Sequence, residues 1–78
     1  MIETIAVTSS AISKLSYHSG MSVLQVEFRD GTIYRYIDVP MHAYRELLRA
    51  DSKGAHLNNQ IRNVFAHAVG PMIDLANP

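Results

Sequence analysis

The stretch Asp30-Gly31-Thr32-Ile33-Tyr34-Arg35-Tyr36 decides the fold, because it closes a hairpin and carries two closely spaced tyrosines. Residues 23–28 before it and 32–37 after it both alternate apolar and polar side chains, which is typical of half-buried strands. Two connections fit the residues between them. One is a two-residue turn on Asp30-Gly31, and the other is a three-residue loop that ends with Gly31 in the left-handed region as a bulge.

The choice between these connections determines which side chains share the apolar face. The three-residue loop pairs Val26 with Tyr34 and Leu24 with Tyr36, so both tyrosines join the aliphatic side chains. The two-residue turn instead places Arg35 opposite Val26, and burying an unpaired guanidinium is costly. We therefore favour the three-residue loop and expect Tyr34 and Tyr36 to be mainly core residues.

Length and composition indicate one small domain whose net charge creates no strong electrostatic field. The chain has 78 residues, and its seven Lys plus Arg balance its seven Asp plus Glu. Binding to a nucleic acid or a membrane would therefore need a local patch. Cysteine is absent, which excludes disulfides, thiolate zinc sites and cysteine nucleophiles. Glu3 stands where a signal peptide has a base, and no apolar run approaches a membrane span, so we expect a soluble cytoplasmic protein.

The rest of the chain predicts one more strand, over residues 11–17, and two helices. Pro40 suits the first position of a helix that covers about 40–50, and Ser52 is a good N-cap for the next helix. That second helix runs to the stop signal Gly70-Pro71, because one apolar stripe recurs at helical spacing along it. The stripe consists of Leu57, Ile61, Val64, Phe65 and Ala68.

These elements predict an α+β fold within a single domain of residues 1–78. A three-stranded antiparallel meander is followed by two helices packed on one face of the sheet, in the order β-β-β-α-α. Residues 1–8 form either a fourth, N-terminal edge strand or a frayed lead-in. The core covers about residues 9–69, and residues 70–78 form a C-terminal tail.

One further set of signals follows a recognisable order along the chain: Ser10, Ile12, Leu15, Tyr17, Leu24-x-Val26-x-Phe28, Asp30-Gly31, Tyr34-x-Tyr36, Val39-Pro40, Tyr44, Leu47-Leu48-x-Ala50, Ser52-Lys53-Gly54, Asn58 and Ile61-Arg62. Their order and spacing resemble the KTSC domain over about residues 9–66. That domain is named for its place at the C-terminus of some lysyl-tRNA synthetases, and it also occurs as a small stand-alone protein in bacteria and phages. The resemblance implies a small α+β module of unestablished function, for which RNA binding has been proposed.

The tyrosine pair permits two interpretations. Single-stranded nucleic-acid modules present aromatic rings on a sheet face with basic residues between them, and Tyr34-Arg35-Tyr36 has that composition. Strand alternation, however, places Arg35 on the face opposite the rings. The alternative is that both tyrosines are amphipathic core residues whose hydroxyl groups reach the rim of the core.

The start of the second helix is the best candidate for an anion site. The amides of a first helical turn are unpaired, and Gly54 beside Lys53 would let a phosphate approach. Gly54, Asn58 and Arg62 follow at i, i+4 and i+8 on one face, which makes a phosphate-contacting strip. The alternative is an ordinary Ser52 cap, a glycine required for close packing, and polar residues that tie down loops.

Other polar residues give weaker indications. Arg45 and Arg49 lie one turn apart on the first helix and extend a basic face or form a solvated surface of mixed charge. The four histidines lack the spacing of a metal pair, and no pattern argues for catalysis. We expect no metal and no cofactor.

These observations predict a non-enzymatic binding module whose partner is RNA or another nucleic acid. The alternative is a protein-interaction or self-association module that uses an edge strand or the apolar tail around Met72, Ile73 and Leu75. The candidate nucleic-acid contacts are Lys53, Gly54, Asn58, Arg62, Arg45, Arg49, Tyr34 and Tyr36.

Overall fold

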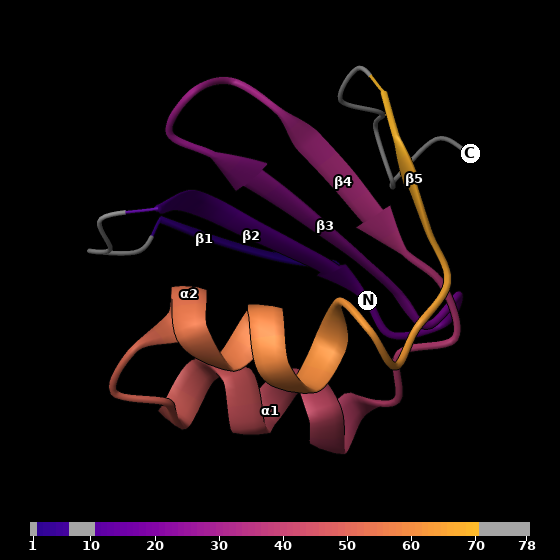
Figure 1. Cartoon of the computed structure of the whole chain (residues 1–78). Helices are drawn as coiled ribbons and strands as arrows, with labels where there is room; N and C mark the ends of the chain where they lie inside the picture. Colours follow the sequence, from indigo (N-terminus) through magenta and orange to yellow (C-terminus); the bar gives the residue numbers. More distant parts are fainter. Residues whose placement is uncertain (1, 7–10, 71–78) are drawn as a thin grey trace.

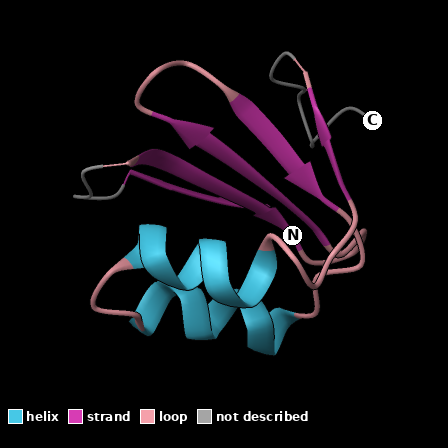
Figure 2. Cartoon of the chain, in the orientation of Figure 1, coloured by secondary structure: helices cyan, strands magenta, loops and turns pink. Residues whose placement is uncertain are grey.

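One antiparallel sheet carries helices on a single face. The structure, a computed structural model, describes residues 2–6 and 11–70. The five strands are neighbours in chain order, and both helical segments lie on the same side of the sheet (Figures 1 and 2). The elements are β1 (Ile2–Ala6), β2 (Ile12–His18), β3 (Val23–Phe28), β4 (Ile33–Tyr36), α1 (Met41–Arg49), α2 (Lys53–His56), η1 (Leu57–Ile61) and β5 (His67–Val69).

The β3–β4 hairpin has the three-residue loop. Val26 pairs with Tyr34 and Leu24 with Tyr36, which confirms the favoured register. Gly31 has φ 92°, a conformation that glycine adopts without steric cost, and its N–H donates to the carbonyl of the last β3 residue at 3.0 Å. Both tyrosines of β4 therefore lie on the face that the helices cover.

The N-terminal segment is an edge strand, which was one of the two alternatives for it. β1 pairs with β2, with Ile5 opposite Leu15. The Thr4 hydroxyl donates to the Ser16 hydroxyl at 3.2 Å across this pair. The sheet therefore has two strands more than the predicted meander: β1 at one edge and β5 at the other. The predicted apolar tail lies outside the described residues.

The second helix is shorter than the periodicity predicts. It runs from Lys53 to Ile61, and its second half is a π-helical turn. Phe65 packs against the core and its N–H still donates to the Ile61 carbonyl at 3.0 Å, but Val64 is 65% exposed and Ala68 is exposed as well. The predicted stripe is thus wrong at Val64 and at Ala68.

Pairing with β4 explains why the chain leaves the helix. Without β5, the outer edge of β4 would present unpaired backbone groups. β5 instead pairs along β4, and the hydrogen bonding extends by one residue past each end of β5. The Ile37 N–H donates to the Ala66 carbonyl at 2.9 Å, and the Gly70 N–H donates to the Ile33 carbonyl at 3.1 Å. Tertiary hydrogen bonding outweighs the helical pattern here.

The core fills the space between the sheet and the helices. Tyr17 and Tyr44 join the two layers, because their rings stack with centroids 4.5 Å apart, and the Tyr17 hydroxyl donates to the Val39 carbonyl at 2.6 Å. The buried apolar residues come from both layers and the loops between them. They are Ile12, Leu15, Tyr17, Leu24, Val26, Tyr36, Val39, Tyr44, Leu47, Leu57 and Ile61.

Tyr17→Phe and Tyr36→Phe form a matched pair that tests this packing. Tyr17→Phe removes the donor to a buried carbonyl, so we expect a loss of about 1–2 kcal/mol in the free energy of unfolding. The Tyr36 hydroxyl has no hydrogen-bond partner among the described residues, so its removal should leave that free energy unchanged or raise it. Urea denaturation measures both; equal losses in the two variants would contradict this assignment.

Candidate functional site

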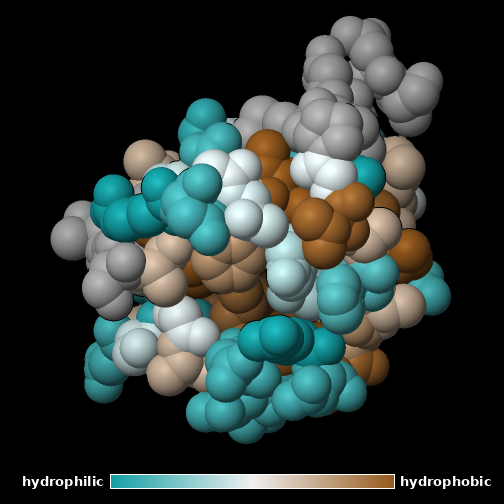
Figure 3. Space-filling model, turned by 45° about the horizontal axis from the view of Figure 1, so that its top comes forward, coloured by the Kyte–Doolittle hydropathy of each residue, from teal (hydrophilic) through white to brown (hydrophobic). Residues whose placement is uncertain are grey.

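A cleft of about 560 Å³ opens between the β3–β4 hairpin and the second helix. The sheet side supplies Phe28, Arg29, Asp30, Thr32, Tyr34 and Tyr36. The helix side supplies Gly54, Leu57, Asn58 and Arg62, and Ala11 completes the lining. Figure 3 shows hydrophobic atoms recessed between groups of hydrophilic side chains on one face of the molecule. The volume lies in the range of small-molecule sites.

Aromatic rings form the wall of the cleft on the sheet side. Phe28 and Tyr34 meet edge to face with ring centroids 5.4 Å apart. His67 of β5 stacks on Tyr34 at 5.3 Å with an interplanar angle of 4°, which holds the ring in place. Tyr34 stays half-buried, so it is neither a free platform nor a fully enclosed core residue.

Tyr36 lies deeper in the cleft and is completely buried. Its hydroxyl has no hydrogen-bond partner within the part of the chain that the structure describes. Burial raises the pKa of Tyr36 above its usual value near 10, and Tyr34 adds to this effect, whereas the positive charge of Arg62 opposes it. The hydroxyl is therefore protonated at neutral pH and lies within the field of the guanidinium.

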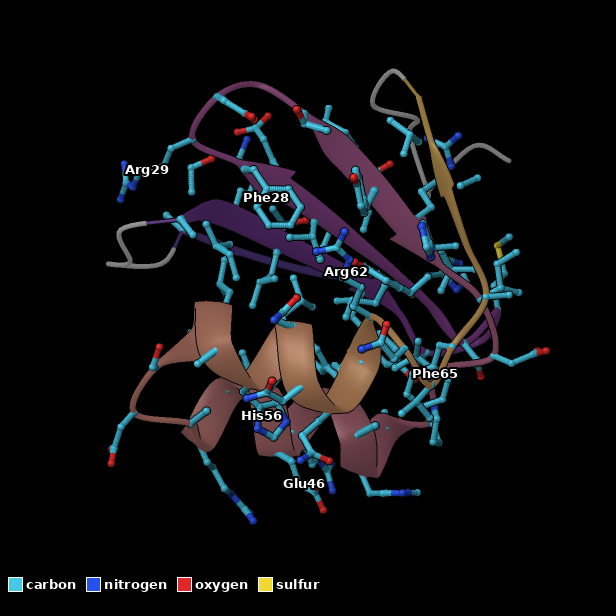
Figure 4. The ribbon with its side chains drawn as sticks, in the orientation of Figure 1. Phe28, Arg29, Glu46, His56, Arg62 and Phe65 are labelled. Carbon is cyan, nitrogen blue, oxygen red and sulfur yellow. The ribbon has the colours of Figure 1, made fainter. Side chains whose placement is uncertain are left out.

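Arg62 and Asn58 form the polar rim on the helix side. The π-helical turn η1 carries Asn58, and Arg62 follows directly after it. An Arg62 N–H donates to Asn58 Oδ1 at 3.2 Å, and Figure 4 shows the Arg62 side chain reaching from the helix toward the sheet. Arg62 has no carboxylate partner among the described residues, so its charge is available to a ligand.

Asp30 places a negative charge on the opposite wall. The Thr32 N–H donates to Asp30 Oδ1 at 2.9 Å in an Asx-type turn at the hairpin tip. Hydrogen bonds from Thr32 lower the pKa of this carboxyl, so it is ionised at neutral pH. The cleft thus has the Arg62 cation on its helix side, whereas its sheet side carries both the Asp30 carboxylate and the guanidinium of Arg29.

The structure separates the predicted contact residues into two groups. Gly54, Asn58, Arg62, Tyr34 and Tyr36 line the cleft. The others are absent from its lining. Arg45 and Arg49 lie exposed on α1, and the Lys53 ammonium donates to the Ala50 carbonyl at 3.3 Å.

The start of the second helix has the ordinary Ser52 cap of the structural alternative. Ser52 Oγ accepts from the Ala55 N–H at 3.3 Å, which makes it a cap. A Cβ at Gly54 would lie 3.4 Å from the Cβ of Ala11, which is an ordinary van der Waals contact, so packing does not require glycine at this point. Phosphate binding at this turn remains a prediction.

Sequence reasoning missed the sheet side of the cleft near the hairpin tip. Phe28, Arg29, Asp30 and Thr32 were interpreted only as strand and turn residues. The favoured register does contain a signal for one contact, since it places Phe28 opposite Thr32 beside the Val26 and Tyr34 pair. The position of His67 depends on β5, which the helical pattern concealed.

The described residues contain no group of three His, Cys, Asp or Glu side chains that could hold a metal ion. No helix among them is both long enough and apolar enough to cross a membrane.

Asp30→Asn tests the charge at the hairpin tip. Asparagine keeps an oxygen that accepts from Thr32 but carries no charge. A carboxyl whose pKa is lowered by folding stabilises the fold at pH values above its unfolded-state pKa, here 3.8. This contribution is lost as the pH falls through the lower pKa of the folded state. We expect the wild type to be the more stable protein at neutral pH and the difference to vanish in acid. Urea denaturation at several pH values measures the difference in unfolding free energy between the two proteins. A difference that does not change with pH would contradict this prediction.

Comparisons with known proteins agree on one family. The KTSC domain matches residues 8–65. The chain is 40% identical over 57 residues to an uncharacterised protein of Stutzerimonas stutzeri, covering 73% of this chain and 80% of that protein. It is also 38% identical over 56 residues to a lysine–tRNA ligase of Nostoc punctiforme, covering 72% of this chain but only 10% of the ligase.

A solved structure shows the same fold. The crystal structure of a KTSC domain protein from Yersinia pestis superposes with a TM-score of 0.81 at 28% sequence identity, covering 87% of this chain and 96% of that protein. The family match extends over most of the chain, and it includes both walls of the cleft. The chain therefore belongs to the KTSC domain family.

Proposed function

We propose that this domain is a non-catalytic module that binds single-stranded RNA in the cleft between the β3–β4 hairpin and the second helix. The observation that carries the proposal is the guanidinium of Arg62, which has no carboxylate partner among the described residues and reaches across an aromatic-lined cleft. A related region occurs within lysine–tRNA ligases, whose name states that they act on an RNA.

The two walls of the cleft match the two parts of a nucleotide. Modules that bind single strands combine cationic groups for the phosphates with aromatic rings for the bases. Arg62 supplies the cation on the helix side, and Phe28 and Tyr34 supply the rings on the sheet side. Asn58 holds the guanidinium at the rim through its side-chain oxygen, which limits the positions that Arg62 samples.

The balance of charge limits the strength of this binding. A chain with formal net charge zero has no long-range attraction for a polyanion, so affinity must come from contacts within the cleft. Arg45, Arg49 and Lys53 lie outside the lining, and we assign them no direct contact with the seated nucleotide. We therefore expect a shallow dependence of affinity on salt.

Self-association through a sheet edge is the second candidate. β5 has only β4 as a neighbour among the described strands, and all three of its residues are exposed. An open edge of this kind is a template for pairing with another chain. In this case the cleft would have no part in recognition.

Arg62→Gln tests the proposed function. Arg49→Gln on α1, outside the cleft lining, is the matched control. Loss of one charge-assisted contact should weaken binding of a short single-stranded RNA roughly tenfold. The negative slope of log affinity against log salt concentration should become shallower by about 0.7. Fluorescence anisotropy at several salt concentrations measures both quantities. Arg49→Gln should bind as the wild type does.

Two outcomes would overturn this function. Equal affinities of Arg62→Gln and wild type would remove the cleft as the RNA site. A wild-type protein that binds no RNA but sediments as a dimer would favour association through β5.

A further inference from the structure

The Tyr36 hydroxyl lacks the partner that a buried polar group normally has. Tyr36 is 0% exposed, and no described residue accepts or donates a hydrogen bond at its oxygen. Most buried polar groups in folded proteins are satisfied, and one left unpaired destabilises the fold. Phenylalanine would fill nearly the same volume without that cost. The hydroxyl is therefore not explained by packing.

The position of this hydroxyl relates it to a ligand. Tyr36 belongs to the lining of the cleft, whereas the buried tyrosine Tyr17 donates to a backbone carbonyl within the core. Two other rings lie near the Tyr36 ring: those of Tyr34 and His67, with centroids 6.2 and 5.4 Å away. The hydroxyl has almost no accessible surface, so a polar atom of a ligand reaches it only if the side chains that line the cleft move apart. In that poorly solvated setting a hydrogen bond is strong.

The charges at the rim orient what enters. Arg62 on the helix side attracts a phosphate, whereas on the sheet side the charge of ionised Asp30 is offset by the neighbouring Arg29, so that side has no net attraction for a phosphate. A nucleotide therefore has its phosphate against the helix and its planar base between the two layers. The π-helical turn η1 carries Asn58 and is followed directly by Arg62, and such turns are frequent at functional sites.

We infer that the cleft takes a single nucleotide with its base inserted, and that the Tyr36 hydroxyl hydrogen-bonds the polar edge of that base and so gives the domain a base preference. This inference rests on the proposed RNA binding and adds base selection to it. A hydroxyl both donates and accepts, so the preferred base is the one whose edge reaches it when the phosphate lies on Arg62.

The test uses short single-stranded RNAs that differ at one central base, with the wild type, Tyr36→Phe and Arg62→Gln. The wild type should bind one base roughly tenfold more tightly than the weakest. Tyr36→Phe should lower affinity for the preferred RNA by about that factor and leave the weakest RNA unaffected. Arg62→Gln should instead weaken all four RNAs by a similar factor, because a phosphate contact carries no base information. An unchanged amide spectrum confirms that each variant is folded.

The outcomes separate this inference from the function beneath it. Equal wild-type affinity for the four RNAs, or a Tyr36→Phe loss that is the same for all of them, would overturn base selection while RNA binding stands. A wild type that binds none of the RNAs would overturn both.

Discussion

The left-handed conformation of Gly31 is the constraint on which the rest of the structure depends. With φ 92°, this residue closes a three-residue loop and so sets the register of β3 against β4. A slip of one residue would turn every side chain of β4 to the other face. Tyr34 and Tyr36 would then leave the helix-facing side, and Arg35 would take their place. The core and one wall of the cleft thus follow from a single turn.

Much of the fold could be predicted from local patterns. Alternation identified β2, β3 and β4, and Pro40 and Ser52 marked the starts of the helices. The end of the second helix could not be found in this way, because Val64 and Ala68 continue the helical spacing although the chain has already turned toward β4. Hydrophobic periodicity reflects local helix preference only. The unpaired backbone groups on the open edge of β4 lie about 30 residues earlier in the chain, and periodicity carries no information about them.

The candidate site was predictable on one side only. Helical spacing placed Gly54, Asn58 and Arg62 on one face, and all three line the cleft. The pattern of a helix start also suggested Lys53, but its ammonium donates back to the Ala50 carbonyl. The sheet side could not be predicted, because the turn at the hairpin tip already explains the presence of Asp30. The sequence pattern gives no separate indication that this residue also lines a cleft. Only packing of the helix against the hairpin brings Asp30 and Arg62 to the same cleft.

The most direct test of this account is an amide chemical-shift titration of the isotope-labelled protein with short single-stranded RNA, run beside an unrelated polyanion. The account predicts that RNA shifts the amides of residues 28–36 and 54–62, on the two walls of one cleft, at near-physiological salt, and that the polyanion does not reproduce these shifts. Shifts confined to β1, β5 or α1, or equal shifts with both ligands, would contradict it.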